Sequence, residues 1–360
     1  MKKVFISDCE GPISKNDNAF EITSHFVPNG DKLFTVISRY DDVIADVIKK
    51  PRYKAGYTLK LILPFLKAYD VTDQKMREFS AQNLILIPNA RDTLQYVRNI
   101  AHTFIVSTSY EHYIKALCQA LNFPYENTYC TKVSLDKYYM TAGEKNSLKD
   151  LTREIQQMFT IEIPSGAKSL NDFPEEYRKT IQRLDEIFWK EIANMESGKI
   201  FREVNPVGGE EKADAVKEAA ERAGADLSSV MYVGDSITDV EAFKLVNENN
   251  GLTVSFNGNQ YAVKNAEIAV LSENTIVTAI IADAFCRFGK RETLDLVENW
   301  SLEALKNSHV SQTLLNRLFV LYPGELPKVK IITSENMEVL IKESSKFRKK
   351  VRGEAIGRLG

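Results

Sequence analysis

The stretch from Lys2 to Ser14 reads KKVFISDCEGPIS. Its apolar run, Val4 to Ile6, is short, contains β-branched residues and ends before Gly-Pro, which is typical of a buried parallel strand. Asp8 and Glu10 follow two positions apart, so they point the same way at the carboxyl end of that strand. Open α/β sheets bind ligands at this edge, and unpaired carboxylates there are costly unless a metal or a reaction uses them. The alternative is a Gly-Pro turn flanked by incidental acids, and this stretch alone leaves both open.

The composition excludes several classes of protein. A length of 360 residues allows one core domain with insertions, or two to three units, and 44% hydrophobic with 27% charged residues is ordinary for a folded soluble chain. A net charge of -2 gives no reason to expect nucleic acid or an anionic membrane as a partner. The four cysteines are widely spread without a CxxC pair, which argues against zinc and against a disulfide framework. No apolar run is long enough for a signal peptide or a membrane span, so we expect a cytoplasmic protein.

The periodicity of apolar residues divides the chain into segments. Helical spacing directly after the first strand indicates a helical insertion, and a second, charged stretch indicates another, mostly helical one. The last segment is expected to be helical, with one strand near Val329–Ile332 and a basic tail that includes Arg352. We therefore predict core segments at 1–14, 84–135 and 200–280, insertions at 15–83 and 136–199, and a C-terminal helical region at 281–360.

Further apolar runs predict strands that end in polar residues. Ser107 follows the strand at 103–106, and Asp235 and Asp239 follow the strand at 230–233, while Lys212 opens the helix before it. Taken singly, Ser107 could be a helix cap, Lys212 a solvated lysine and Asp235 part of a turn. Their order along the chain, an acid, Ser, Lys and two acids, argues against coincidence. Two more strands are expected at 252–256 and 268–271, and a further candidate lies at 133–135.

This order of motifs resembles the haloacid dehalogenase (HAD) superfamily, and most of all its phosphoserine-phosphatase-type phosphohydrolases. DCEGP from Asp8 is similar to the first motif, FIVS ending at Ser107 to the second, Lys212 to the third, and GDSITD over 234–239 to the fourth. The resemblance covers the core and neither insertion nor the region after about Thr275. It implies an α/β fold with a Rossmann-like, doubly wound parallel sheet and a helical cap inserted after the first strand.

The resemblance also implies a chemistry. Asp8 would attack phosphorus and form an aspartyl-phosphate, with Mg²⁺ held by Asp8, Asp235 and the backbone carbonyl of Glu10. Asp239 would hold the metal through water or fix Lys212. Ser107 and Lys212 would bind the non-bridging phosphoryl oxygens. The expected catalytic set is thus Asp8, Glu10, Ser107 and Lys212, and the expected metal set is Asp8, Glu10, Asp235 and Asp239.

Glu10 departs from the family pattern, which has Asp at this position as the acid that protonates the leaving group. Glu10 could do the same work with adjusted geometry, which we favour, or it could limit activity to unusual leaving groups, or the site could bind phosphate without turnover. Pro12, in place of the usual Thr, stiffens the loop. Cys9 lies between the two acids but would face away from them, so we interpret it as a core residue.

In this superfamily, substrate choice resides largely in the cap. His25, Arg39, Arg52 and Lys54 are therefore candidates for binding a second charged group of the substrate, and the alternative for each is a solvated surface charge. The leading hypothesis is a Mg²⁺-dependent phosphatase acting on a small phosphorylated metabolite. The competing one is a non-catalytic subunit that binds a protein partner through the cap or the C-terminal region. A phosphotransferase or mutase would need a second acceptor site that the sequence does not reveal.

Overall fold

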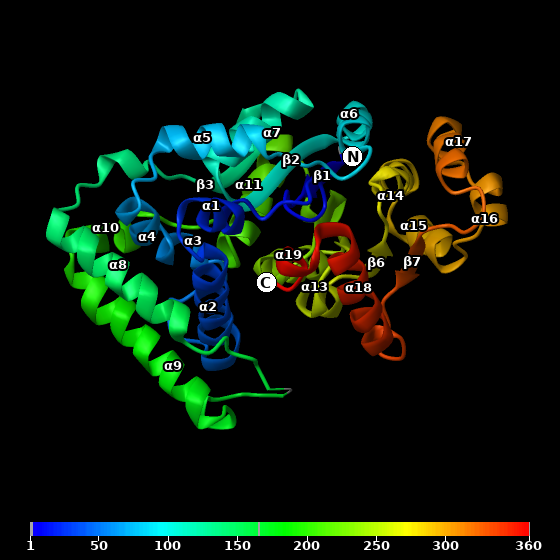
Figure 1. The fold of residues 1–360 in the computed structure, drawn as a ribbon. Coiled ribbons are helices and arrows are strands. Elements are labelled where there is room, and N and C mark those ends of the chain that lie inside the picture. The colour runs from blue at the N-terminus through cyan, green and yellow to red at the C-terminus, as the bar shows by residue number, and fades with distance from the viewer. Residues whose placement is uncertain (1–2, 165, 360) are drawn as a thin grey trace.

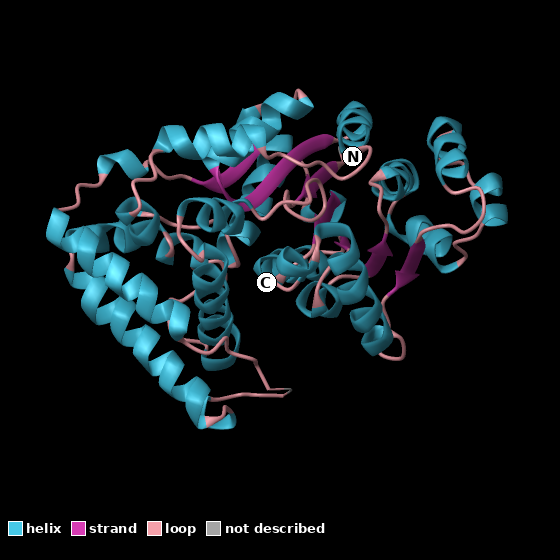
Figure 2. Ribbon diagram, in the orientation of Figure 1, coloured by secondary structure: helices cyan, strands magenta, loops and turns pink. Residues whose placement is uncertain are grey.

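A seven-stranded sheet forms the centre of the protein. The computed structural model describes residues 3–164 and 166–359. Positions 1–2, 165 and 360, which belong to the predicted segments 1–14, 136–199 and 281–360, lie outside the described residues. The strands lie in the order β3-β2-β1-β4-β5-β6-β7, parallel except for β7. They are β1 (Val4–Ser7), β2 (His102–Tyr110), β3 (Thr128–Thr131), β4 (Val230–Gly234), β5 (Leu252–Phe256), β6 (Ile268–Leu271) and β7 (Lys328–Ile331). This sheet with helices around it confirms the predicted α/β, Rossmann-like fold class (Figures 1 and 2).

Both faces of the sheet are covered, which explains why β1 is an unbroken apolar run. Phe5 belongs to one apolar cluster with residues of α6, α7 and α14, whereas Val4 and Ile6 belong to a second cluster with residues of α11 and α12. Alternate side chains of a strand point to opposite faces, so a strand buried on both sides needs apolar residues at every position. The core helices are α6 (Ala90–Ile100), α7 (Glu111–Leu121), α11 (Glu210–Ala223), α12 (Val240–Glu248), α13 (Gln260–Asn265) and α14 (Ile276–Phe288).

The two predicted insertions share one hydrophobic core and together form a helical cap. Phe188 of the second insertion packs against Tyr40 and Phe65 of the first, with ring centroids 5.6 Å and 6.3 Å apart. In Figure 1 these helices gather on the left, away from β6 and β7. The cap helices are α1 (Asn18–Phe26), α2 (Gly30–Asp42), α3 (Thr58–Leu61), α4 (Leu63–Ala68), α5 (Asp73–Gln82), α8 (Ala142–Gln157), α9 (Glu175–Glu186) and α10 (Lys199–Glu203), with a π-helix, η5 (Ile187–Glu191), that carries Phe188.

The C-terminal region touches both the core and the cap. Helix α18 packs against α13 of the core, while Leu359, near the end of the chain, joins the apolar cluster of the cap. Figure 1 shows α18 and α19 in red near the middle of the molecule. The elements of this region are α15 (Lys290–Glu298), α16 (Leu302–Asn307), α17 (Gln312–Leu321), the antiparallel strand β7, α18 (Met337–Arg352) and α19 (Glu354–Gly357).

The strand expected over 133–135 is wrong. The structure places β3 earlier, at Thr128–Thr131, and a short 3-10 helix, η3 (Leu135–Lys137), follows it. β3 is an edge strand, partly exposed at its first two positions, so its sequence TYCT carries no continuous apolar run. Val133 and Leu135 are buried instead in the core of the cap. Within the described ranges, no helix combines the length and apolar character needed to cross a membrane.

Candidate active site

Three adjacent strands bring the predicted residues to one edge of the sheet. β1 lies between β2 and β4, and Ser7 at the end of β1 pairs with residues of both. Asp8 directly follows Ser7, Ser107 lies on β2, and Asp235 directly follows β4. All three line a single cavity of about 100 Å³. Asp8, Ser107 and Asp235 are therefore neighbours in the folded protein although they are far apart in the sequence.

The ammonium group of Lys212 lies between two carboxylates. Its Nζ is 2.9 Å from Oδ2 of Asp8 and 2.7 Å from Oδ1 of Asp239. Lys212 is fully buried in the first turn of α11, which follows Gly209 at a φ of +58°. This bridge fixes the Asp8 carboxylate on the core side of the cavity.

Asp239 is engaged on both of its oxygens. Oδ1 accepts a hydrogen bond of 2.7 Å from the hydroxyl of Tyr232, in addition to the contact with Lys212. Oδ2 accepts the backbone N–H groups of Asp235 and Ser236 at 3.0 Å each. Of the two roles left open for Asp239, this geometry fits the fixing of Lys212.

Electrostatics inside the site keep Lys212 charged. Burial alone would lower the pKa of Lys212, but the adjacent carboxylates of Asp239 and Asp8 outweigh it and raise that pKa. Burial also raises the pKa of Asp239, but Lys212 and the hydrogen bonds hold it below its ordinary value. For Asp8 burial dominates, and the pKa of its carboxyl is raised in spite of Lys212. A second cation near Asp8 would therefore favour its ionised form.

Glu10 faces the cap side of the cavity. Its Oε1 accepts the backbone N–H of Asn18, the first residue of α1, at 2.7 Å. Burial, and then the charge of Asp17, raise the pKa of Glu10 well above its ordinary value, which favours the protonated form of the carboxyl. A protonated carboxyl that lines the cavity can donate to a leaving group. Cys9, between the two acids, is buried in the apolar cluster on one face of the sheet.

Sequence reasoning missed two arginines of the site. Arg348 Nη1 and Arg352 Nη1 both contact Oδ2 of Asp235, the second at 3.1 Å, although α18 lies more than a hundred residues further along the chain. Both side chains are only 4% exposed. In the sequence Arg352 belongs to a basic tail, a pattern that usually indicates a solvated helix face. No local signal distinguishes these arginines from their exposed neighbours.

The cations proposed from the cap lie outside the cavity. Arg39 pairs with Asp42, at 3.2 Å, and Lys54 pairs with Glu211. The ring of His25 packs edge-on against Phe26, with centroids 4.6 Å apart. Arg52 lines a separate groove between cap and core. His25, Arg39, Arg52 and Lys54 are not among the described residues that line the cavity of Asp8, so their contact with a second charged group of the substrate stays a prediction.

Three of the four predicted metal ligands come together. Asp8, Asp235 and Asp239 each offer a carboxylate oxygen within 4.8 Å of the others, and all three residues are buried. Such a set of oxygen donors suits a hard cation such as Mg²⁺. The arginines of α18 contact Oδ2 of Asp235, which leaves Oδ1 for a cation. The carboxyl of Glu10 is not in this group of described residues, so a metal contact of Glu10 through its backbone carbonyl stays a prediction.

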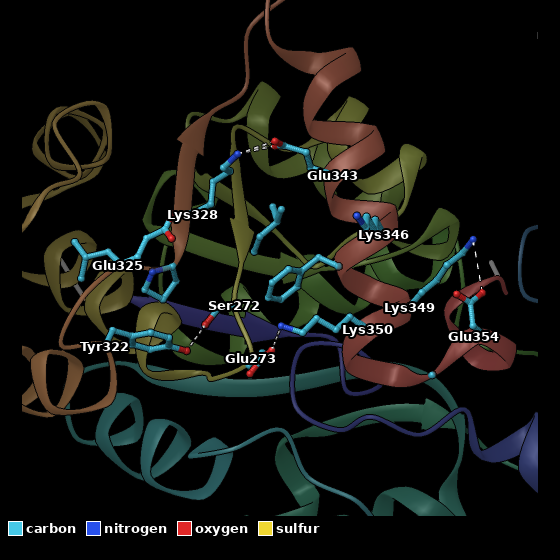
Figure 3. Close-up of a pocket in the computed structure, with 15 residues that line it drawn as sticks. Ser272, Glu273, Tyr322, Glu325, Lys328, Glu343, Lys346, Lys349, Lys350 and Glu354 are labelled. Carbon is cyan, nitrogen blue, oxygen red and sulfur yellow. Dashed lines mark hydrogen bonds and ion pairs between the residues drawn. The ribbon is translucent and has the colours of Figure 1, made fainter.

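A larger cavity lies beside the outer face of α18. It has a volume of about 1020 Å³ and is bordered by β6, β7 and α18 (Figure 3). Lys346 and Lys350 of α18 belong to it, whereas Arg348 and Arg352 belong to the cavity of Asp8. Helix α18 thus separates the two cavities.

Fold and site together define a Rossmann-like protein with a lysine-paired acidic centre at the sheet edge. A family model described as haloacid dehalogenase-like hydrolase matches residues 71–283, more than half of the chain. The protein belongs to this family of hydrolases. The matched range contains Ser107, Lys212, Asp235 and Asp239, and the geometry of the site adds Asp8 and Glu10 to them.

Similar solved structures support the fold. Gene product AF1437 from Archaeoglobus fulgidus is 24% identical, with a TM-score of 0.80 over 100% of this chain and 99% of that chain, so the shared fold includes the cap and the C-terminal region. Phosphoserine phosphatase in its apo form is 13% identical over 76% of this chain and 96% of that chain, with a TM-score of 0.42. Its substrate-bound complex is also 13% identical, over 76% of this chain and 95% of that chain, with a TM-score of 0.45. These two low scores carry no argument about activity. A search of curated proteins gives no match.

Proposed function

We propose that the protein is a phosphomonoester hydrolase that acts on a small phosphorylated metabolite through an aspartyl-phosphate at Asp8, with Mg²⁺ as cofactor. Membership of the hydrolase family supports the reaction class. The observation that carries the proposal is the Lys212 bridge between Asp8 and Asp239 in a buried cavity. Phosphate esters repel anionic nucleophiles, so a site that attacks them needs positive charge beside the nucleophile, and Lys212 supplies part of it.

The hydrogen bonds of Asp8 suit a nucleophile. The N–H of Cys9 donates to Oδ1 at 2.6 Å and Lys212 contacts Oδ2, so the carboxylate is held in one orientation. In the first step an oxygen of Asp8 bonds to phosphorus while the bond to the leaving oxygen breaks, and Glu10 gives that oxygen its proton. In the second step water gives a proton to Glu10 and attacks phosphorus, the bond to Asp8 breaks, and phosphate is released.

Lys212 and Ser107 would donate to the non-bridging phosphoryl oxygens, where negative charge collects in the transition state. The hydroxyl of Ser107 is 3.2 Å from that of Ser109, and both lie at the end of β2. Mg²⁺, held by Asp8, Asp235 and the backbone carbonyl of Glu10, would supply positive charge that screens the carboxylate from those oxygens.

The direct test is hydrolysis of p-nitrophenyl phosphate by the wild-type protein and by Asp8→Asn, with Mg²⁺ and with EDTA. We expect metal-dependent turnover that Asp8→Asn abolishes. Asp214→Asn is the matched control, because Asp214 is exposed on α11 and pairs with Lys217 at 3.1 Å. Trapping with beryllofluoride, followed by ¹⁹F NMR, reports a phosphorylatable Asp8 without the need for turnover. Absence of both turnover and trapping would refute the enzyme and favour the non-catalytic subunit.

The role of Glu10 has its own test. Protonation of the leaving oxygen matters most when that oxygen is strongly basic, so Glu10→Gln should slow ethyl phosphate far more than p-nitrophenyl phosphate. We expect a loss of about a hundredfold or more on ethyl phosphate, since positioned acid catalysis contributes about 10²–10⁴. Equal losses on the two substrates would contradict the role of Glu10 as the acid.

A protein partner at the cap or the C-terminal region stays a prediction.

A further inference from the structure

Positive charge reaches the cavity of Asp8 from an unexpected element. Of the described residues that line this cavity, the two arginines of α18 are the cationic ones, and Lys212 contacts Asp8 without belonging to the lining. The rest of the lining comes from the core and from cap residues such as Phe34, Ser38 and Leu59. The arginines are thus placed at the boundary between the reacting centre and the cap.

The two arginines differ in how fully their donors are used. Arg352 donates from Nε to the carbonyl of Lys15 at 3.0 Å and from Nη2 to that of Asn16, besides its contact with Asp235. Arg348 is less well satisfied: its Nη2 has a long contact of 3.4 Å to the carbonyl of Leu359, and its Nε is buried without a partner. An unpaired buried donor is costly, and so it indicates a group that accepts from it in the working site.

The charges around the arginines point the same way. Both contact one oxygen of Asp235, and Asp17 is the other carboxylate whose charge acts on both. When Asp235 binds a cation, its charge is shared with that cation. Asp17 then remains as the carboxylate that acts on both guanidinium groups, while the charges of Glu10 and Glu21 also act on Arg352, so the positive charge of Arg348 is the less well matched of the two.

We propose that Arg348 binds a second anionic group, a carboxylate or a phosphate, on the leaving group of the substrate. Arg352 acts as a positioning residue that ties α18 to the loop at Lys15 and to Asp235. Guanidinium groups bind carboxylates and phosphates through paired N–H donors, so Arg348 suits either kind of second anionic group. The inference rests on the proposed hydrolase and narrows its substrate to a doubly anionic ester.

The size of the cavity limits that ester. A volume of about 100 Å³ is far below the several hundred that are typical of pockets for drug-sized ligands. The phosphoryl group and the second anion must therefore be separated by a short linker. Thr108, whose Oγ1 is buried without a partner, lines the same cavity and is available to a polar linker.

The test measures binding of non-hydrolysable probes by isothermal titration calorimetry, on the full chain with Mg²⁺. The probes are ethylphosphonate with one anionic group, phosphonoacetate with an added carboxylate, and 1,2-ethanebisphosphonate with an added phosphonate. We expect the wild-type protein to bind one of the last two at least about tenfold more tightly than ethylphosphonate. Because all probes share the metal and the phosphonate, the ratio of their affinities isolates the second anion.

Variants assign the preference to Arg348. Arg348→Gln should reduce the affinity ratio to about one, and Arg348→Lys, which keeps the charge but loses the planar fork, should retain part of it. Lys346→Gln is the control, because it removes the same charge from the outer side of α18. A parallel comparison of kcat/KM for 2-phosphoglycolate, ethylene glycol bisphosphate and ethyl phosphate should give the same change of ratio.

Each outcome decides a separate statement. A wild-type ratio of about one overturns the inference, even if Arg348→Gln does not fold. A ratio unchanged in Arg348→Gln also overturns it, since the second anion then binds elsewhere. A high affinity ratio without turnover on any ester supports the anion site and refutes the hydrolase. Turnover with an affinity ratio of about one supports the hydrolase and overturns the anion site.

Discussion

The Lys212 bridge predicts a specific stability effect. Lys212→Met keeps an unbranched side chain of similar length and removes the charge between Asp8 and Asp239, which lie 2.9 Å and 2.7 Å from Nζ. Removal of one partner of a buried ion pair costs about 3–5 kcal/mol, because the remaining charge is uncompensated. Asp239 keeps the hydrogen bonds from Tyr232 and from the backbone N–H groups of Asp235 and Ser236, and Asp8 can take up a proton. We therefore expect the lower end of the range, about 3 kcal/mol.

The assay is urea unfolding of the wild-type protein and Lys212→Met in EDTA, at pH 7.5 and pH 5.5. Burial raises the pKa of Asp8 to about 7, against Lys212, so the folded-state value lies above that of the unfolded chain. The ionisation of Asp8 then destabilises the folded state above that pKa, and this penalty decreases as the pH falls from that pKa towards the pKa of the unfolded chain. Without Lys212 the penalty is larger. The difference in the free energy of unfolding between wild type and Lys212→Met should thus be smaller at pH 5.5 than at pH 7.5.

Two further arms sharpen this test. Lys217→Met lies on the same helix, is half exposed and pairs with Asp214 at 3.1 Å, so it should change stability by less than about 0.5 kcal/mol. Addition of Mg²⁺ should reduce the loss of unfolding free energy in Lys212→Met, since a cation replaces part of the lost charge. A loss below about 1 kcal/mol in EDTA, or one that grows at pH 5.5, would refute our reading of the bridge.

Two other substitutions test the site loop and the cap. Gly11 has a φ of +107°, and a Cβ at this position would lie 2.1 Å from Oδ2 of Asp235. Gly11→Ala should therefore lower the urea midpoint, weaken Mn²⁺ binding in EPR titrations and reduce turnover. Gly143→Ala is the control, because the space around Gly143 is open, and it should have none of these effects. Phe188→Ala should cost about 3–5 kcal/mol in urea unfolding, because it opens the core that both insertions share, and Tyr139→Ala, at a residue 74% exposed, should be neutral. Intact stability in Phe188→Ala would mean that the insertions fold independently.

Local patterns in the sequence predict the centre of the fold. The apolar run from Val4 to Ile6 is continuous because both faces of β1 are buried, and burial of this kind is visible within a few residues. The polar residues after β1, β2 and β4 converge because parallel strands end at a common edge. Lys212 was identified by its position in the order of motifs, and the structure places it against Asp8.

Features that depend on long-range packing could not be predicted in this way. The edge strand β3 is half exposed, so Thr128–Thr131 lacks the apolar run by which strands are recognised, whereas Val133 and Leu135 are apolar because of the cap. The shared core of the two insertions joins segments that lie more than a hundred residues apart. The arginines of α18 belong to the same class: in sequence they look like any basic helix end, and only tertiary structure buries them.

The burial of these arginines places part of the C-terminal region against the candidate active site. Arg348 contacts Asp235 across 113 positions of the chain, and Arg352 contacts the carbonyl of Lys15 across 337. The site is therefore closed by contacts between the two ends of the chain. Contacts of such separation have a high entropic cost of loop closure, and the Asp235 side of the site depends on the docking of α18 for them. A residue of α18 that loosens this docking should then affect the Asp235 side of the site while leaving the Lys212 bridge in place, because the bridge is built entirely from core elements.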